Sequence, residues 1–258
     1  MSLGDITYLS IVPNKSQKKY QDIDSIIKIG NNSSDKLNFG KKIIYTYQKP
    51  TIDSGDFEIK IIDEIPHNEF NDFALQNYSK LFDTDYAINF HSDGFIQNQE
   101  AWDDIFLEYD YIGAPIAIRM SENEYLPLVG NGGFSLRSKK ICEKIKELKS
   151  SDYLPQFLDA WGDMLITKDL FKILPTFFKN EDLYIGFFCN KILKEKGFKI
   201  SDLKTASLFS TEHFSLLHNI SSNSLEDMIC SFGFHEINAL KTPAVSEHRK
   251  RIQEKMTQ

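Results

Sequence analysis

Three polar side chains follow directly after an apolar run in the segment NFHSDGF, residues 89–95. His91, Ser92 and Asp93 come together, and Gly94 would let the backbone turn sharply and approach a ligand. In open α/β sheets, ligands bind beyond the carboxyl ends of the strands. If the apolar run is a strand, Asp93 stands where a carboxylate can hold a hard divalent cation that binds a diphosphate. The alternative is an ordinary turn, which Asp and Gly also favour.

A more obvious acidic pair, Asp83 and Asp85 in FDTDY, precedes the same apolar run. It therefore lies at the amino end of the expected strand, away from the edge where ligands bind. A second metal ligand is offered instead by His235 in SFGFHE. An imidazole added to oxygen ligands suits Mn²⁺ better than Mg²⁺, although a single His beside aromatic residues is also common in cores and turns.

The segment VGNGGFSLRSKK, residues 129–140, is rich in glycine but matches none of the common glycine motifs. It is neither GxGxxG nor GxxxxGK[ST], and it lacks the second glycine of GxSxG, so dinucleotide binding, P-loop chemistry and hydrolase triads lose support. Gly132 and Gly133 would let a flat ligand such as a sugar ring lie against the backbone, with Asn131 free to bond its hydroxyls. The alternative is a tight turn with a structural purpose only.

Two acidic residues, Glu181 and Asp182, open a predicted helix in KNEDLYIGFF. With Asn180 as N-cap, helix capping and the helix dipole already explain acidic residues at these positions. The functional interpretation makes Asp182 a general base that takes the proton from an acceptor hydroxyl. On chemistry alone, Glu181 could do the same.

Apolar periodicity predicts alternating strands and helices around these segments. The alternation favours an α/β sheet packed on both faces in one domain, with no internal repeat. The predicted strands are 6–12, 42–47, 57–62, 86–90 and 111–115, and a late segment with β character is 203–210. The predicted helices are 16–30, ended by Gly30, then 66–82, 100–109, 138–150, and 181–197, ended by Gly197.

Composition narrows the class of protein. The chain has 258 residues, 41% of them hydrophobic and 26% charged, which is ordinary for a globular domain. A net charge of −7 argues against a nucleic-acid binder, because such proteins concentrate basic residues. The three cysteines lie far apart without a CxxC spacing, so a reducing cytoplasm is expected. The sequence offers no apolar run long enough to span a bilayer, and the basic HRKRIQEK in the tail 241–258 allows at most peripheral membrane contact.

The segments DTDYAINFHSDGFIQN, W..IFLEYDYIGAP, VGNGGFSLRS, NEDLYIGFFCNKIL and FGFHE, in this order, resemble a family of bacterial and viral proteins taken to be glycosyltransferases. This family is catalogued mainly as a domain of unknown function, and the resemblance spans about residues 66–238. More distantly, the arrangement is similar to metal-dependent GT-A fold glycosyltransferases, including galactosyltransferases. The resemblance implies a single GT-A-like (Rossmann-like) α/β domain over residues 1–240, with a central mixed sheet flanked by helices, and a polar basic tail over 241–258.

The resemblance also implies a reaction: metal-dependent, inverting transfer of a sugar, hexosyltransferase-like, from a nucleotide-diphosphate donor to a hydroxyl of a glycan or lipid-linked glycan. Asp182 would be the base, and Glu181 a secondary candidate. Asp93 and His235 would hold Mn²⁺ rather than Mg²⁺, and His91 stands where the first acidic residue of a DxD element is expected. The implied donor-binding residues are His91, Ser92, Gly94, Asn131, Gly132 and Gly133, together with Val12 and Asn14 as a nucleotide-base wall by fold analogy.

Other functions stay open at this point. If Asp182 is only a cap, a retaining course becomes possible. A sugar-nucleotide or carbohydrate-binding module with the same fold would bind without turnover, and His91 in place of a carboxylate favours it. A metal-dependent phosphohydrolase would gather carboxylates and histidines at several strand ends, whereas this sequence shows one such end clearly.

Overall fold

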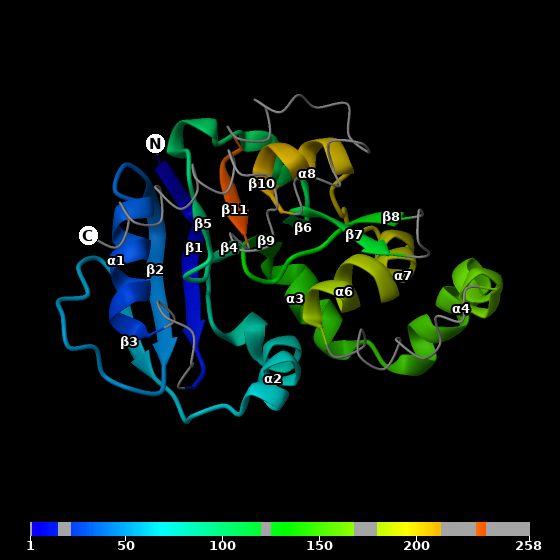
Figure 1. Ribbon diagram of the computed structural model, residues 1–258, viewed down its shortest axis with the longest axis horizontal. Helices are drawn as coiled ribbons and strands as arrows, with labels where there is room; N and C mark the ends of the chain where they lie inside the picture. The colour runs from blue at the N-terminus through cyan, green and yellow to red at the C-terminus, as the bar shows by residue number, and fades with distance from the viewer. Residues whose placement is uncertain (1, 15–21, 120–124, 168–179, 213–230, 236–258) are drawn as a thin grey trace.

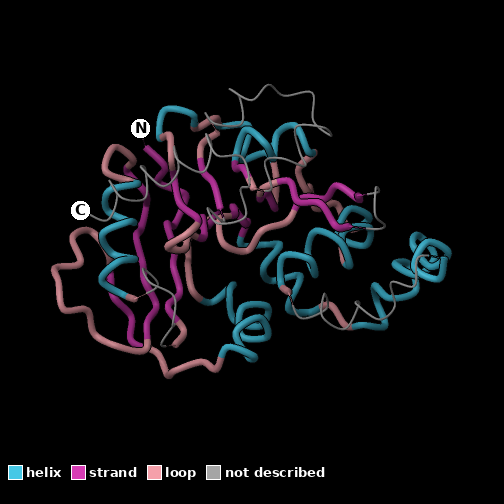
Figure 2. Tube along the Cα trace, in the orientation of Figure 1, coloured by secondary structure: helices cyan, strands magenta, loops and turns pink. Residues whose placement is uncertain are grey.

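A six-stranded mixed sheet forms the centre of the protein (Figures 1 and 2). The computed structural model describes residues 2–14, 22–119, 125–167, 180–212 and 231–235. The strands in spatial order are β3 (Glu58–Ile61), β2 (Asn38–Thr46), β1 (Ser2–Val12), β4 (Tyr86–Asn89), β9 (Ser135–Ser138) and β6 (Tyr111–Gly113).

The chain adds β2 and β3 on one side of β1 and then continues with β4 on the other side, so the strand order switches at β1. β1 pairs in parallel with β2 on one side and with β4 on the other, and β2 pairs in parallel with β3. β9 then runs antiparallel to both β4 and β6. The carboxyl ends of β1 and β4 therefore lie side by side where the strand order switches, which is the place where open α/β sheets leave a crevice for ligands.

Alternate residues of the strands fill two cores, one on each face of the sheet. On one face, Tyr8 and Phe90 stack with ring centroids 4.1 Å apart, under the apolar side of α1 (Ile23–Ser33). On the other face, Leu9 and Ala87 pack with α2 (Phe70–Asn77) and α3 (Lys139–Glu147). Helices thus cover both faces, as the sequence predicts.

Two smaller sheets lie beside it in the described part of the chain. One has the order β10 (Ser210–Thr211), β11 (Gly233–His235), β5 (Gly94–Ile96), and the other is the hairpin of β7 (Pro115–Arg119) and β8 (Tyr125–Val129). The remaining helices are α4 (Ser150–Thr167), α6 (Glu181–Leu183), the π-helix η6 (Tyr184–Phe188), α7 (Asn190–Glu195) and α8 (Leu203–Phe209). Short 3₁₀ turns are η1 (His67–Glu69), η2 (Tyr78–Lys80), η3 (Gln99–Ala101) and η4 (Asp104–Glu108).

Three predicted elements differ from the structure. Gly30 lies inside α1 rather than at its end, because the helix passes so close to the core that a Cβ there would meet Phe57 at 2.6 Å. Residues 100–109 form two short 3₁₀ turns in place of one helix. The side chains of Asn98 and Asp103 each accept a backbone N–H bond, so a new turn begins at each of these residues. The segment 203–210 is wrongly predicted as β structure.

That segment is the helix α8 up to Phe209, followed by the two residues of β10. Asp202 caps the helix by accepting the N–H of Thr205 at 2.9 Å, and Leu203, Lys204, Ala206 and Leu208 are good helix formers, so both the cap and the composition favour a helix. Gly197, by contrast, follows α7 with a left-handed φ of 84°, as predicted for a helix end. No helix in the described ranges has the length and apolar character that crossing a bilayer requires. The basic tail 241–258 and residues 236–240 of the predicted domain lie outside the described residues.

Candidate functional site

A tight turn follows β4 and carries the polar side chains that the sequence singles out. His91 N donates to the carbonyl of Gly94 at 2.7 Å, and Gly94 N returns a bond to the carbonyl of His91 at 3.3 Å. Just before the turn, Phe90 N donates to Leu9 O at 2.9 Å, which fixes the segment beside β1. The turn therefore sits at the carboxyl edge of the sheet where the strand order switches. The sequence leaves two alternatives for Asp93, an ordinary turn and a ligand site. Asp93 does lie in a turn, and the position of that turn is compatible with a ligand site.

His91, Asp93 and His235 form a cluster in which one donor atom from each residue lies within 4.8 Å of the others. His235 reaches the turn because β11 runs antiparallel to β5 with His235 opposite Gly94. Its Nε2 is 3.8 Å from Asp93 Oδ1. Burial lowers the pKa of His91, which favours the neutral imidazole that a metal requires. Two imidazoles and one carboxylate fit a divalent transition metal better than Mg²⁺.

Glu212 joins this cluster, although sequence reasoning missed it. It follows β10, which pairs in parallel with β11, and its Oε1 lies 3.5 Å from His235 Nδ1. Its side chain is buried. Metal-bound histidines commonly present their second nitrogen to a carboxylate, which fixes the ring and its tautomer. No local sequence pattern marks Glu212, because only the strand pairing brings it beside His235.

Residues 130–133, which we call the glycine loop, lie between this cluster and the acidic pair. Asn131 has a left-handed φ of 87°, and its Oδ1 accepts the N–H groups of Gly133 (2.7 Å) and Phe134 (3.1 Å). A Cβ on Gly133 would lie 2.0 Å from His235 Nε2, and a Cβ on Gly132 would lie 2.0 Å from Glu181 Oε1. These two positions leave no room for any side chain.

The side-chain amide of Asn131 is the second polar feature of this loop. Its Nδ2 is buried and has no hydrogen-bond partner among the residues that the structure describes. Asn89, the last residue of β4, holds the loop in place. Its Nδ2 donates to the carbonyl of Gly132 and lies 3.3 Å from His91 Nε2. The loop is thus bonded to the end of β4, and the Nδ2 group of Asn131 can donate a hydrogen bond to a ligand.

The two acidic residues at the start of α6 have different partners. Glu181 accepts a bond from Arg137 Nη2 at 3.0 Å, and both side chains are buried. The guanidinium also lies over the rings of Tyr78 and Tyr111, at 4.6 and 5.7 Å from their centroids. The charge of Glu181 is therefore paired with that of Arg137, and this buried pair anchors the start of the helix.

Asp182 instead accepts two backbone N–H groups, from Asn131 at 3.0 Å and from Leu183 at 2.8 Å. Burial, followed by the neighbouring charges of Glu181 and Glu212, raises the pKa of Asp182 to about 6. Asn180 stands at the N-cap position but makes no side-chain capping bond. Asp182 is thus a carboxylate at the glycine loop that no cation neutralises among the described residues.

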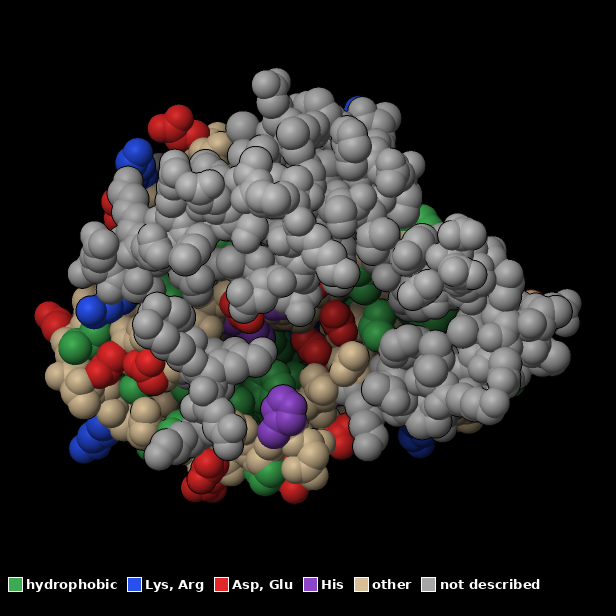
Figure 3. Space-filling view, in the orientation of Figure 1, with side chains coloured by type: hydrophobic (Ala, Val, Ile, Leu, Met, Phe, Trp, Pro, Cys, Tyr) green, Lys and Arg blue, Asp and Glu red, His purple; other side chains and the backbone are tan. Residues whose placement is uncertain are grey.

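The remaining predicted residues lie nearby or serve the fold. Ser92 is buried within the turn, and Val12 is buried at the carboxyl end of β1. Asn14 donates its amide to the carbonyl of Ile65 at 2.7 Å, so it ties two loops together. Asp83 is exposed and pairs with Lys41 at 2.7 Å, at the opposite end of β4, as expected. Figure 3 shows histidine and acidic side chains side by side near the middle of the face it presents.

The sequence profile of the family described as "Protein of unknown function (DUF5672)" matches residues 56–238. The chain belongs to this family. The match to the DUF5672 family includes every residue of the cluster, the glycine loop and the acidic pair. β1 and β2 precede the matched residues, yet β1 forms the centre of the same sheet and pairs with β4. No curated protein matches the sequence.

Proposed function

We propose that this DUF5672 protein is a metal-dependent glycosyltransferase with a GT-A-like fold. It would move a sugar from a nucleotide-diphosphate donor to a hydroxyl of a glycan or lipid-linked glycan, in the cytoplasm and in polysaccharide biosynthesis. One observation carries the proposal. At the switch point of the sheet, one short loop contacts both groups: Asn131 N donates to the carboxylate of Asp182, and Gly133 lies against His235 of the cluster formed with His91 and Asp93.

His91, Asp93 and His235 are the residues that would hold the metal, with Mn²⁺ preferred because of the two imidazoles. When bound, such a cation neutralises the negative charge that develops on a departing diphosphate. Glu212 would keep His235 in the orientation that points Nε2 toward Asp93. The nitrogen-rich set also fits Fe²⁺, so assays should compare the two ions.

Asp182 is the residue best suited to act as base. With its pKa raised to about 6, the carboxylate is ionised at neutral pH and still basic enough to take a proton from a hydroxyl. The N–H groups of Asn131 and Leu183 each occupy one of its oxygens and fix its orientation, and each oxygen keeps a second lone pair for the proton. Glu181 is less suited because Arg137 already holds it.

The donor sugar would lie against the backbone of Gly132 and Gly133, next to the side chains of Glu181 and His235, which already fill the space of the missing Cβ atoms. The buried amide Nδ2 of Asn131 would donate to a sugar hydroxyl. Held there, the anomeric carbon meets the acceptor oxygen in line as Asp182 removes its proton, which gives an inverting displacement. The leaving diphosphate would depart toward His91 and Asp93.

The experiment is a panel of UDP, GDP, CDP and dTDP sugars with and without Mn²⁺, with release of the nucleoside diphosphate as the readout. We expect release with one class of donor, dependent on the metal. Asp182→Asn should lower the rate by about 10² to 10⁴, the usual contribution of a general base. Glu100→Gln, at an exposed position in η3, is the matched control and should keep the rate.

A second candidate follows from His91, which replaces the first carboxylate expected in a DxD element. A binding module without turnover would be stabilised by a sugar nucleotide and metal but release no nucleotide with any donor. Metal-dependent stabilisation without release in the full panel would therefore favour the binding module over the enzyme.

A further inference from the structure

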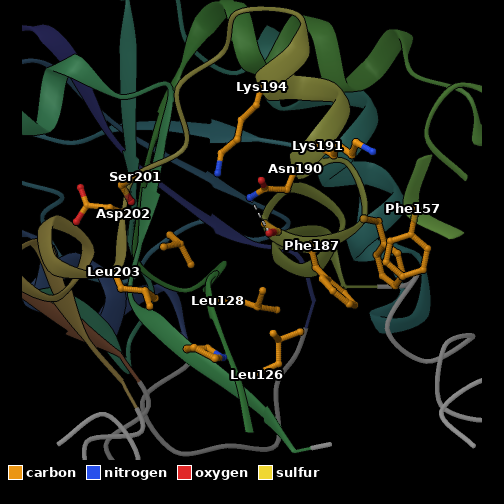
Figure 4. Close-up of a pocket in the computed structure, with 14 residues that line it drawn as sticks. Leu126, Leu128, Phe157, Phe187, Asn190, Lys191, Lys194, Ser201, Asp202 and Leu203 are labelled. Atoms are coloured by element: carbon orange, nitrogen blue, oxygen red, sulfur yellow. Dashed lines mark hydrogen bonds between the residues drawn. The ribbon is translucent and has the colours of Figure 1, made fainter. Parts of the chain in front are cut away.

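A cavity of about 450 Å³ lies apart from the metal cluster, between the hairpin of β7 and β8 and the helices that follow α6. Its walls come from β8, η6, α7, the residues just before α8, and Phe157 of α4 (Figure 4). The volume is in the range of pockets that hold small molecules. Asp182 and the three metal-cluster residues are absent from its lining.

The lining divides into an apolar side and a polar side. Figure 4 shows Leu126, Leu128 and Phe187 on one side of the cavity, and Lys194 and Asn190 of α7 on the other. Asn190 donates to the carbonyl of Gly186 at 3.0 Å, so its amide is held in place. An apolar wall facing a polar one suits a ligand that is itself amphiphilic.

Two polar groups of the lining are available to a ligand. Lys194 is exposed, extends into the cavity in Figure 4, and has no ion-pair partner within the described part of the chain. Its neighbour Lys191 differs, because it pairs with Asp159 at 3.5 Å. Ser201 is buried, and its Oγ has no hydrogen-bond partner among the described residues. An ammonium and a hydroxyl without acceptors favour an anionic group.

The one carboxylate in the lining does not cancel this charge preference. Asp202 accepts the N–H of Thr205 at 2.9 Å and the hydroxyl of Tyr109 at 2.9 Å, so it serves as the cap of α8. These bonds, together with that of the Thr205 hydroxyl, lower the pKa of Asp202 and tie its oxygens to the protein. In Figure 4 its carboxylate points away from Lys194.

We propose that this cavity binds a linear aliphatic chain ending in a single anionic head group, a phosphate or a carboxylate. The aliphatic part lies against Leu126, Leu128 and Leu203, and the head group meets Lys194 and Ser201. The site does not depend on the proposed sugar transfer, because the two share no functional side chain. The backbone connects the two sites, since Val129 of the cavity wall leads into the glycine loop and α6 continues into η6.

The test titrates octyl phosphate, octanoate, octanol and inorganic phosphate separately into the full chain carrying ¹³C-labelled leucine methyl groups. We expect octyl phosphate or octanoate to shift the methyl signals of Leu126, Leu128 and Leu203, and to leave those of Leu9 in the sheet core unchanged. The comparison of the two anions identifies the head group. Absence of shifts with both anions, or shifts confined to other leucines, would overturn the proposal.

Lys194→Met tests the charge without removing the aliphatic stem. It should weaken binding of the anion about fivefold, as expected for a partly exposed ion pair, and leave octanol binding unchanged. Lys196→Met is the matched control, because Lys196 lies at the end of the same helix, is exposed and does not line the cavity. Equal loss in both variants, or no loss in Lys194→Met, would contradict the assigned head-group site. Added Mn²⁺ should change neither result.

Discussion

Asp182 is expected to lose its proton near pH 6 in the folded protein. Burial raises its pKa most, the charges of Glu181 and Glu212 add to the rise, and backbone bonds offset only part of it, so the value moves from 3.8 to about 6. This difference corresponds to about 3 kcal/mol in favour of the neutral form. Ionised Asp182 therefore costs folding stability above about pH 6, and the cost disappears as the pH falls toward 3.8.

The measurement is an NMR titration of ¹³C-labelled aspartate carboxyl groups, which needs no substrate. The signal of Asp182 is identified by its absence in Asp182→Asn. At pH 5, a pKa of 6 leaves about one carboxyl group in ten ionised, whereas an ordinary aspartate with a pKa near 3.8 is more than about nine-tenths ionised. The two cases are therefore clearly separated at a single pH.

Asp83 provides the internal control. It is exposed, and its bond to Lys41 lowers its pKa, so its signal should be fully that of the ionised form at pH 5. A midpoint for Asp182 near pH 4 would refute the reasoning that burial and the adjacent acidic residues hold its proton. It would also remove the raised pKa as a reason for choosing Asp182 as base, and would leave only the pairing of Glu181 with Arg137.

Three further substitutions test the geometry of the site. Gly133→Ala places a methyl group 2.0 Å from His235 Nε2, so stabilisation by Mn²⁺ in a thermal-shift assay should be lost. Glu212→Gln removes the charge that faces His235 Nδ1 and should weaken Mn²⁺ binding about 10- to 100-fold by calorimetry. Arg137→Met leaves Glu181 as a buried charge without its partner and should destabilise the fold by about 3–5 kcal/mol in urea unfolding.

Two of these substitutions, Gly133→Ala and Arg137→Met, have a control that makes a similar change elsewhere in the chain. A Cβ on Gly4 meets nothing within 4 Å, so Gly4→Ala should bind Mn²⁺ like the unmodified protein. Lys41→Met breaks only the exposed pair with Asp83 and should leave stability almost unchanged. Unimpaired Mn²⁺ binding by Gly133→Ala, or an Arg137→Met variant as stable as Lys41→Met, would show that the described contacts do not control the site.

Local sequence patterns are sufficient to locate the strand end that carries the candidate site. The apolar run from Tyr86 to Phe90 marks the strand β4, and the order of residues along the chain then places Asp93 at its carboxyl end and Asp83 at its amino end. The glycine pair at 132 and 133 is likewise visible in the sequence, and in the structure a Cβ at either position would meet Glu181 or His235. Features encoded within a few residues were therefore predictable.

The partners of these residues were not predictable, because they come from distant strands. Glu212 meets His235 only through the pairing of β10 with β11, and Arg137 meets Glu181 only because β9 lies beside α6. The helix α8 shows a second limit of prediction from the sequence, since it is wrongly predicted as β structure. The cap at Asp202 and the packing of Phe209 in the core favour the helix over the predicted strand.

The most direct test of a metal-dependent site for a diphosphate compares thermal unfolding of the protein and of Asp93→Ala. Each is measured with Mn²⁺ alone, with a nucleoside diphosphate alone, and with both together. We predict that the two together raise the unfolding temperature of the unmodified protein more than either alone, and that Asp93→Ala loses this increase while keeping its fold. An equal increase in Asp93→Ala, or none in the unmodified protein with any of UDP, GDP, CDP or dTDP, would contradict the central claim.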